Sequence, residues 1–303
     1  MIRFMIVALA ALLVFVLPVS AQNREMLGHG RLVNNDLLGD FKDRWQSGSV
    51  ASSRVIGFGW NGNLPSRPFD LLEFRLGGQV VTPEDFRNPS DGDRPFVGAL
   101  SLGLHTHFER GGTEISMGGD LVVTGPQTGL GDLHTAIHDV LRQKPARPSV
   151  LDDQIEDGFH PTFVGEAGRQ FTLGRGVLRP FSELRWGAET LGRVGADFTI
   201  GQVGQGELLI RDPVTGQRYR TIYEFQSGLS YVVGGDFAWV ENSVFLPEDR
   251  GYEVEKTRTR LRAGMHWQGE RNATFFGVTY LSEEFDDQDE GQLVGSVRLK
   301  LKF

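Results

Sequence analysis

The sequence predicts an all-β fold, a twelve-stranded antiparallel transmembrane β-barrel with a short extracellular loop helix. Three observations favour this fold: apolar and polar residues alternate along most of the chain, the chain begins with an export signal, and it contains no cysteine. An exported protein without disulfides must obtain its stability from packing or from closure of its sheet. A closed barrel meets that need, because it has no free edge and satisfies its backbone polar groups inside a bilayer.

Residues 1–21 are predicted to be a cleaved secretory signal peptide. Arg3 supplies the charged start, an uncharged apolar run from Phe4 to Leu17 follows, and Val19-Ser20-Ala21 is a small-residue cleavage pattern. The alternative is a membrane anchor, but the apolar run is too short to span a bilayer comfortably. We therefore expect cleavage after Ala21 and a single outer-membrane barrel domain over residues 22–303.

The charge of the chain limits its partners. The formal net charge of −8 argues against a nucleic-acid partner, whose binding surface would need a basic excess. No segment after the signal approaches the apolar length of a transmembrane helix, so no such helix is expected.

The last strand indicates which face meets lipid. In "VGSVRLKLKF" (294–303), valine, leucine and phenylalanine side chains fall on one face, and Arg298, Lys300 and Lys302 fall on the other. The same pattern recurs in 71–80, 96–108 and 257–267. A soluble sandwich alternates as well, but the export signal, the long strands and the aromatic residues near strand ends favour a barrel that is apolar outside and polar inside.

Twelve strands are expected, and the even number puts both chain ends on the periplasmic side. Their expected ranges are 27–35, 49–60, 69–81, 94–108, 113–124, 158–172, 177–188, 191–203, 220–247, 252–267, 271–283 and 291–303. The range 220–247 is too long for one crossing, so we expect this strand to extend beyond the bilayer and to pair back with Tyr252 onward.

The connections divide into two kinds. Short turns at 61–63, 109–112, 173–176 and 268–271 fit periplasmic hairpins. The longer, acidic or proline-bearing connections then all lie on the outer side, at 36–48, 82–93, 125–157 and 284–290.

One segment, "GPQTGLGDLHTAIHDVL" (125–141), has helical rather than strand periodicity. Its apolar stripe should lie on the barrel rim or in the outer leaflet, with His134 and His138 together on the border of the stripe. Three interpretations of the histidine pair stay open: half of a zinc site without a visible third ligand, solvated surface residues, or a general base. Spacing alone favours the solvated interpretation.

Four ordered segments resemble the outer-membrane lipid A 3′-O-deacylase (LpxR) family. They are "NND" (34–36), "DRWQSG" (43–48), "TPEDF" with "GDRPFVGAL" (82–100), and "GPQTGLGDLHTAIH" (125–138) followed by "DDQIEDG" (152–158). Together with the export signal and the barrel pattern, the resemblance spans essentially the whole mature chain.

The resemblance implies a calcium-dependent esterase that removes the 3′-linked acyloxyacyl chain of lipid A from lipopolysaccharide in the outer leaflet of a Gram-negative outer membrane. It implies that His138 is the general base, that Asn35, Asp36 and Ser47 belong to the catalytic site, and that Asp36 is a Ca2+ ligand. Arg87 and His134 are then expected to bind substrate. We expect the barrel to be a monomer.

The segments also depart from the family pattern. The family's glutamate six residues after the histidine falls here on Lys144, so the acidic role is either unfilled or moved to Asp139 or Asp152. His134 stands where the family often has glutamine. The alternative function is a non-catalytic barrel, either a pore or a structural envelope protein whose histidine helix only caps the rim.

Overall fold

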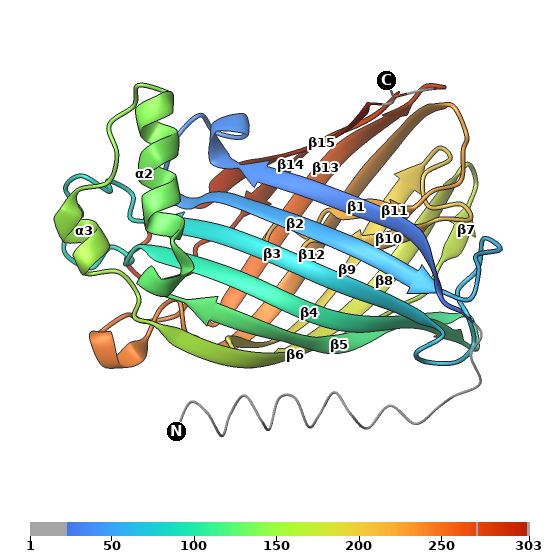
Figure 1. Cartoon of the computed structure of the whole chain (residues 1–303), viewed down its shortest axis with the longest axis horizontal. Coiled ribbons are helices and arrows are strands. Elements are labelled where there is room, and N and C mark those ends of the chain that lie inside the picture. Colours follow the sequence, from blue (N-terminus) through green and yellow to red (C-terminus); the bar gives the residue numbers. More distant parts are fainter. Residues whose placement is uncertain (1–22, 271, 302–303) are drawn as a thin grey trace.

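The computed structural model describes residues 23–270 and 272–301; the expected signal peptide lies outside them. Within these residues, thirteen antiparallel strands form one sheet, which the pairing of β6 with β8 closes into a barrel (Figure 1). The wall strands are β1 (Glu25–Asn35), β2 (Trp45–Gly57), β3 (Leu71–Thr82), β4 (Val97–Arg110), β5 (Thr113–Thr124), β6 (Gly158–Gly168), β8 (Gly176–Trp186), β9 (Glu189–Ile200), β12 (Gly228–Ser243), β13 (Thr257–Gln268), β14 (Asn272–Leu281) and β15 (Gln292–Leu301). The thirteenth, β7 (Phe171–Leu173), pairs only with β8 at the barrel end. The predicted twelve-stranded barrel is thus confirmed.

The alternation of side chains has the predicted sense. Leu102, Leu261 and Leu299 are 58%, 57% and 64% exposed, whereas Arg260 and Arg262, on the same strand as Leu261, are buried. Apolar side chains therefore face outward along the wall, and the soluble-sandwich alternative is wrong, because a sandwich would bury them.

The lumen is filled by paired charges. Asp236 on β12 accepts hydrogen bonds from Arg193, Arg260 and Arg262, which come from the two neighbouring strands β9 and β13. A carboxylate in such a buried position is stable only when cationic donors satisfy it. The charged face of the strands therefore packs on itself rather than lining an open channel.

A small hairpin that sequence periodicity missed also occupies the barrel. Its strands, β10 (Leu208–Arg211) and β11 (Arg218–Ile222), pair only with each other and lie within the outline of the barrel (Figure 1). The expected single strand over 220–247 is therefore wrong: residues up to 222 finish this hairpin, and the wall strand starts at Gly228.

The hairpin is fixed to the inside of the wall. The Tyr219 and Ser53 hydroxyls are 2.7 Å apart, and the Gln217 amide donates to the Ala263 carbonyl at 3.1 Å. Glycine allows the close approach: a Cβ on Gly28 of β1 would lie 2.1 Å from the Thr221 carbonyl oxygen. Burial of Tyr219 against Leu32 and other apolar residues adds to this anchoring.

Other boundaries shift by a few residues. The expected strand 158–172 is interrupted between β6 and β7, and β2 begins at Trp45 rather than at 49. The earlier start places Ser47 inside a strand. The connection around 61–63 is longer than a tight turn, since it runs from the end of β2 to the start of β3.

The helical segments gather at one end of the barrel (Figure 1). The β5–β6 connection carries η2 (Pro126–Thr128), α2 (Leu130–Val140) and α3 (Pro148–Asp152); η1 (Asp36–Leu38) follows β1, and η3 (Glu248–Arg250) follows β12. None of the helices among the described residues has the length and apolar character needed to cross a membrane.

Helix α2 begins against the barrel wall at Gly98 of β4, which has no side chain. A Cβ on Gly98 would lie 2.8 Å from Thr128 Oγ1 and 3.0 Å from Leu130 Cβ, so only glycine accepts the start of the helix at this distance. The left-handed backbone of Gly129 (φ 67°) turns the chain into the helix. These two glycines set where the histidines of α2 meet the barrel.

Candidate active site

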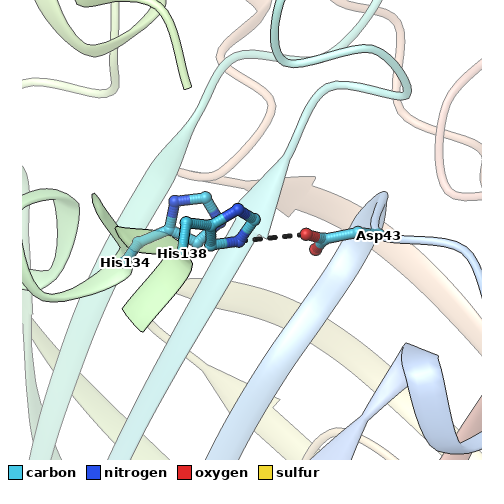
Figure 2. Close-up of side chains that lie close together, drawn as sticks. All are labelled: Asp43, His134 and His138. Atoms are coloured by element: carbon cyan, nitrogen blue, oxygen red, sulfur yellow. Dashed lines mark ion pairs between the residues drawn. The ribbon is translucent and has the colours of Figure 1, made fainter. Parts of the chain in front are cut away.

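The centre of the site is His138, in the last turn of α2. Its side chain is buried, and its Nε2 lies 3.0 Å from Asp43 Oδ2, in the connection that leads into β2 (Figure 2). Its Nδ1 lies 3.2 Å from the Lys144 carbonyl oxygen. A carbonyl oxygen only accepts, so this bond requires a proton on Nδ1 and orients Nε2 toward Asp43.

Asp43 links the histidine to the start of β2. The Ser47 hydroxyl donates to Asp43 Oδ1 at 2.7 Å, and the Asn35 side-chain amide donates to the Ser47 carbonyl at 2.9 Å. The structure thus brings together His138, Ser47 and Asn35, three of the residues predicted from the sequence, through a carboxylate that had no assigned role. Asp43 is the first residue of the "DRWQSG" segment, and this position was the available signal.

Asp36 lies beside this chain of contacts, fully buried at the start of η1. Its two carboxylate oxygens accept the backbone N–H groups of Leu37 and Arg44 at 2.9 and 2.7 Å. Burial nevertheless raises the pKa of the Asp36 carboxyl to about 8, and the negative charges of Asp43 and Asp40 add to the rise. A carboxylate with acidic neighbours in a buried position favours a cation among them.

His134 lies one turn before His138, with the ring centroids 4.2 Å apart. The rings of Phe86 and Phe96 meet it edge-on, both at 5.6 Å, and neither of its nitrogens has a hydrogen-bond partner. Burial lowers the pKa of His134 to about 4, and His138 adds to the fall, so His134 is neutral at pH 7. Both histidines are nine-tenths or more buried, and the solvated interpretation of the pair is wrong.

Arg87 lies at the edge of the site. It is half-buried and follows Phe86, whose ring also contacts His138 edge-on at 5.5 Å. The backbone N–H of Arg87 donates to Asp85 at 2.8 Å, which turns the β3–β4 connection, and the Phe86 carbonyl accepts from the Arg147 N–H at 3.2 Å. The β3–β4 connection is thereby tied to the segment after α2, and Arg87 directly follows the residue that contacts both histidines.

The model of one protein family, the outer membrane protein LpxR, matches residues 6–303. The chain belongs to the LpxR family. Among solved structures, LpxR from Salmonella typhimurium matches with a TM-score of 0.73 and 17% sequence identity, over 91% of this chain and 100% of that chain. This likeness shows the barrel fold, and the family places the chain in the outer membrane.

Other solved barrels are less similar. The β domain of the Bordetella autotransporter BrkA matches with a TM-score of 0.39 and 13% identity, over 92% of this chain and 99% of that chain. The CymD monoaromatic hydrocarbon channel matches with a TM-score of 0.37 and 10% identity, over 92% and 88%. No curated protein sequence matches the chain.

This LpxR-family site differs from the expectation in where its acid lies. Asp139 and Asp152, the expected replacements for the glutamate that Lys144 displaces, are exposed, and the acid beside His138 is Asp43. Lys144 contributes its backbone carbonyl instead of its side chain. Only the packing of the β1–β2 connection against α2 could reveal this exchange.

Proposed function

We propose that this LpxR-family barrel is a lipid A 3′-O-deacylase, which hydrolyses the ester of the 3′-linked acyloxyacyl chain of lipopolysaccharide in the outer leaflet. The observation that carries the proposal is the His138–Asp43 pair at the helical end of the barrel, with Nδ1 of His138 held by the Lys144 carbonyl. The ester lies at the boundary between sugar and acyl chains, and a site on the rim of a membrane barrel can reach it.

His138 is the general base in this proposal. With the Nδ1 proton engaged by the Lys144 carbonyl, Nε2 carries the lone pair that takes a proton from water as the water attacks the ester carbonyl. Asp43 Oδ2, which lies 3.0 Å from Nε2, must turn aside to admit this water. Asp43 then neutralises the positive imidazolium and keeps the ring in place. The proton later passes from Nε2 to the departing sugar oxygen, which completes the hydrolysis.

Water, rather than Ser47, is the nucleophile we favour. A serine nucleophile needs its hydroxyl hydrogen-bonded to the base, but the Ser47 hydroxyl donates to Asp43 at 2.7 Å. Ser47 therefore positions the carboxylate, and the Asn35 amide in turn holds the Ser47 backbone. These residues act on the reaction through His138.

The side chains around Asp36 fit the calcium ion that the family implies. Calcium takes oxygen ligands, and the cluster offers the carboxylates of Asp36 and Asp43, the amide oxygen of Asn35 and the hydroxyl of Ser47. The raised pKa of Asp36 is the mark of a buried acid without enough positive charge nearby. A Ca2+ ion held by Asp36 would supply positive charge where the carbonyl oxygen becomes negative.

The surroundings suit a phosphorylated lipid. The segment after α2 exposes Arg142, Lys144 and Arg147, and Arg87 lies across from it. Leu133 and Ile137 on α2 are 51% and 48% exposed, so an apolar strip faces the outer leaflet beside these cations. Anionic head groups and acyl chains would each find a matching surface at this rim.

The test is removal of the base. Wild type, His138→Ala and His160→Ala are expressed in a Gram-negative host with hexa-acylated lipid A, and the extracted lipid A is analysed by mass spectrometry. His160 is the matched control, because it lies on β6 and bonds Thr124 rather than Asp43. We expect loss of the 3′ acyloxyacyl group with wild type and His160→Ala, and intact lipid A with His138→Ala.

Chelation provides the second arm. EDTA should stop deacylation by wild-type membranes, and added Ca2+ should restore it. Deacylation by a correctly assembled His138→Ala barrel would exclude His138 as the base.

A further inference from the structure

Three side chains with metal-binding atoms face one another at the outer rim. One ligand atom each of Asp43, His134 and His138 lies within 4.8 Å of the others, and no other such group of three occurs in the described part of the chain. Figure 2 shows the two imidazoles side by side on α2, with the Asp43 carboxylate opposite the edge of His138. The three residues come from two connections that the barrel brings together.

His134 has no hydrogen-bonding role in the protein. Its side chain is 6% exposed, and both ring nitrogens lack a partner. Buried polar atoms are nearly always satisfied, so an imidazole without partners at this position indicates an absent ligand. Phe86 and Phe96 meet the ring edge-on, and one of its nitrogens lies within 4.8 Å of the ligand atoms of His138 and Asp43.

The contact between His138 and Asp43 also requires a further group between the two side chains. Because Nδ1 of His138 is bonded to a carbonyl oxygen, Nε2 of the neutral ring presents a lone pair to Asp43 Oδ2 at 3.0 Å. Two acceptors at this distance repel unless a proton or a cation lies between them. A proton would satisfy this pair but leave His134 without a partner, whereas a metal ion satisfies all three residues.

We propose that Asp43, His134 and His138 form a binding site for a transition-metal ion of the zinc class. Two imidazole nitrogens and one carboxylate suit Zn2+ or Co2+ and discriminate against Ca2+, which prefers oxygen ligands alone. Three protein ligands leave a fourth position to water. The Lys144 carbonyl plays the usual part of the outer partner that orients a ligating histidine.

Small adjustments complete the geometry. Ligands about 2.1 Å from a tetrahedral ion lie about 3.4 Å from one another. The 3.0 Å separation of His138 Nε2 and Asp43 Oδ2 must therefore open slightly on binding, and the wider separations, which reach at most 4.8 Å, must close. Asp43 comes from a loop and both histidines lie on one helix face, so rotation of the side chains can supply this movement. The site has no glutamate within "HTAIH", and therefore lacks the base of a zinc-protease helix.

Occupancy would have a consequence for catalysis, which rests on the proposed function. A metal ion on Nε2 of His138 takes the lone pair that the general base needs, so zinc would inhibit the deacylase. Calcium among the oxygen ligands around Asp36 would leave that lone pair free. The metal site itself does not depend on the activity.

The experiment titrates Co2+ into the detergent-solubilised protein, prepared without a histidine tag and stripped with EDTA. Wild type should bind one equivalent, with the visible absorption of four-coordinate cobalt, and Zn2+ but not excess Ca2+ should abolish the absorption. His134→Gln and Asp43→Asn should each weaken binding by at least about tenfold. His160→Gln, which changes a histidine outside the group, should bind like wild type.

Two results would overturn the site: wild type without the four-coordinate spectrum, or the same spectrum and affinity in His134→Gln and Asp43→Asn. Resistance of the folded barrel to SDS before heating verifies that each variant is assembled. Cobalt binding by a protein that deacylates nothing would refute the proposed function and leave the metal site standing. Deacylation by a protein that binds no cobalt would refute the metal site and leave the proposed function standing.

Discussion

At the scale of single residues, the site depends on a carboxylate that faces an imidazole. Asp43 contacts His138 on one oxygen and Ser47 on the other, so it fixes the orientation of the proposed base. Apart from its place at the start of the "DRWQSG" segment, no local pattern marks Asp43, because a loop aspartate before a strand is common. Its importance comes from what lies opposite to it.

Asp43→Asn should reduce kcat on the order of 100-fold with little change in KM, since the amide keeps the shape but cannot stabilise the imidazolium. The measurement uses purified protein and lipid A in mixed micelles. The control is Asp139→Asn, on the exposed side of α2. An unchanged kcat would show that His138 works without this partner.

Asp36 should make the stability of the metal-free protein depend on pH. Its pKa is about 8 in the folded protein, against an ordinary value of 3.8 for an aspartate in water, because burial disfavours the charge. Between these values the folded state keeps a proton that the unfolded chain has released. The free energy of unfolding therefore falls as the pH rises from about 4 to about 8. The stabilisation that comes from the protonated Asp36 is fully present only below this window.

Thermal unfolding with EDTA from pH 4 to 9 measures this effect, and Asp36→Asn should flatten the profile. Excess Ca2+ should flatten the wild-type profile as well if the ion holds Asp36 in its charged form. Identical profiles for wild type and Asp36→Asn would contradict the raised pKa.

At the scale of elements, α2 is inverted relative to a helix on a soluble protein. It buries His134 and His138 and leaves Val140 and Leu141 82% and 57% exposed. The inversion follows from the surroundings, since an apolar stripe beside the outer leaflet is not exposed to water, and His138 meets Asp43 of the β1–β2 connection. The same periodicity in a soluble protein would turn the other face inward.

Gly98→Ala should displace α2 and lower deacylation without unfolding the wall. The added methyl group would meet Thr128 Oγ1 at 2.8 Å and Leu130 Cβ at 3.0 Å, which overpacks the helix start by about 1–3 kcal/mol. Gly119→Ala is the matched control on β5, because its Cβ would meet nothing nearer than the Thr162 oxygen at 3.6 Å. Activity of the two variants is compared at equal amounts of heat-modifiable barrel; equal activity would mean that the helix tolerates the shift.

At the scale of the whole molecule, closure of the sheet and filling of the lumen act together. Closure leaves the twelve wall strands paired in a ring that encloses a polar interior, and that interior is occupied by ion pairs and the β10–β11 hairpin. Arg211 of the hairpin bonds Glu166 and Asp197 of the wall at 2.8 and 3.0 Å. These contacts argue against the pore alternative.

Wild-type protein should therefore give no steady conductance in a planar bilayer. Replacing residues 204–225 by a Gly-Ser turn removes the hairpin while β9 and β12, which already pair, stay connected. We expect this variant to conduct ions, because the hairpin blocks the barrel that remains. Steady current through wild type would revive the pore alternative, and a silent variant would mean that the wall side chains alone close the lumen.

Much of this arrangement is local and could be predicted from the sequence. A strand's alternation has a period of two regardless of its neighbours, so twelve strands, their outward apolar face and the one helical interruption follow from the order of residues. The resemblance of four short segments to a family likewise predicted His138, Asn35, Asp36 and Ser47 as site residues. Strand boundaries were less certain, because residues such as Ser47 lie where the alternation fades.

Tertiary structure alone decided the rest. The segment before Gly228 has the periodicity of a wall strand, yet residues 218–222 fold back into the lumen, where Gly28 lets them approach and Tyr219 finds a partner. Asp43 meets His138 because barrel closure sets which connections share a rim. Strand character depends on neighbours along the chain, whereas partners across space depend on closure of the whole sheet.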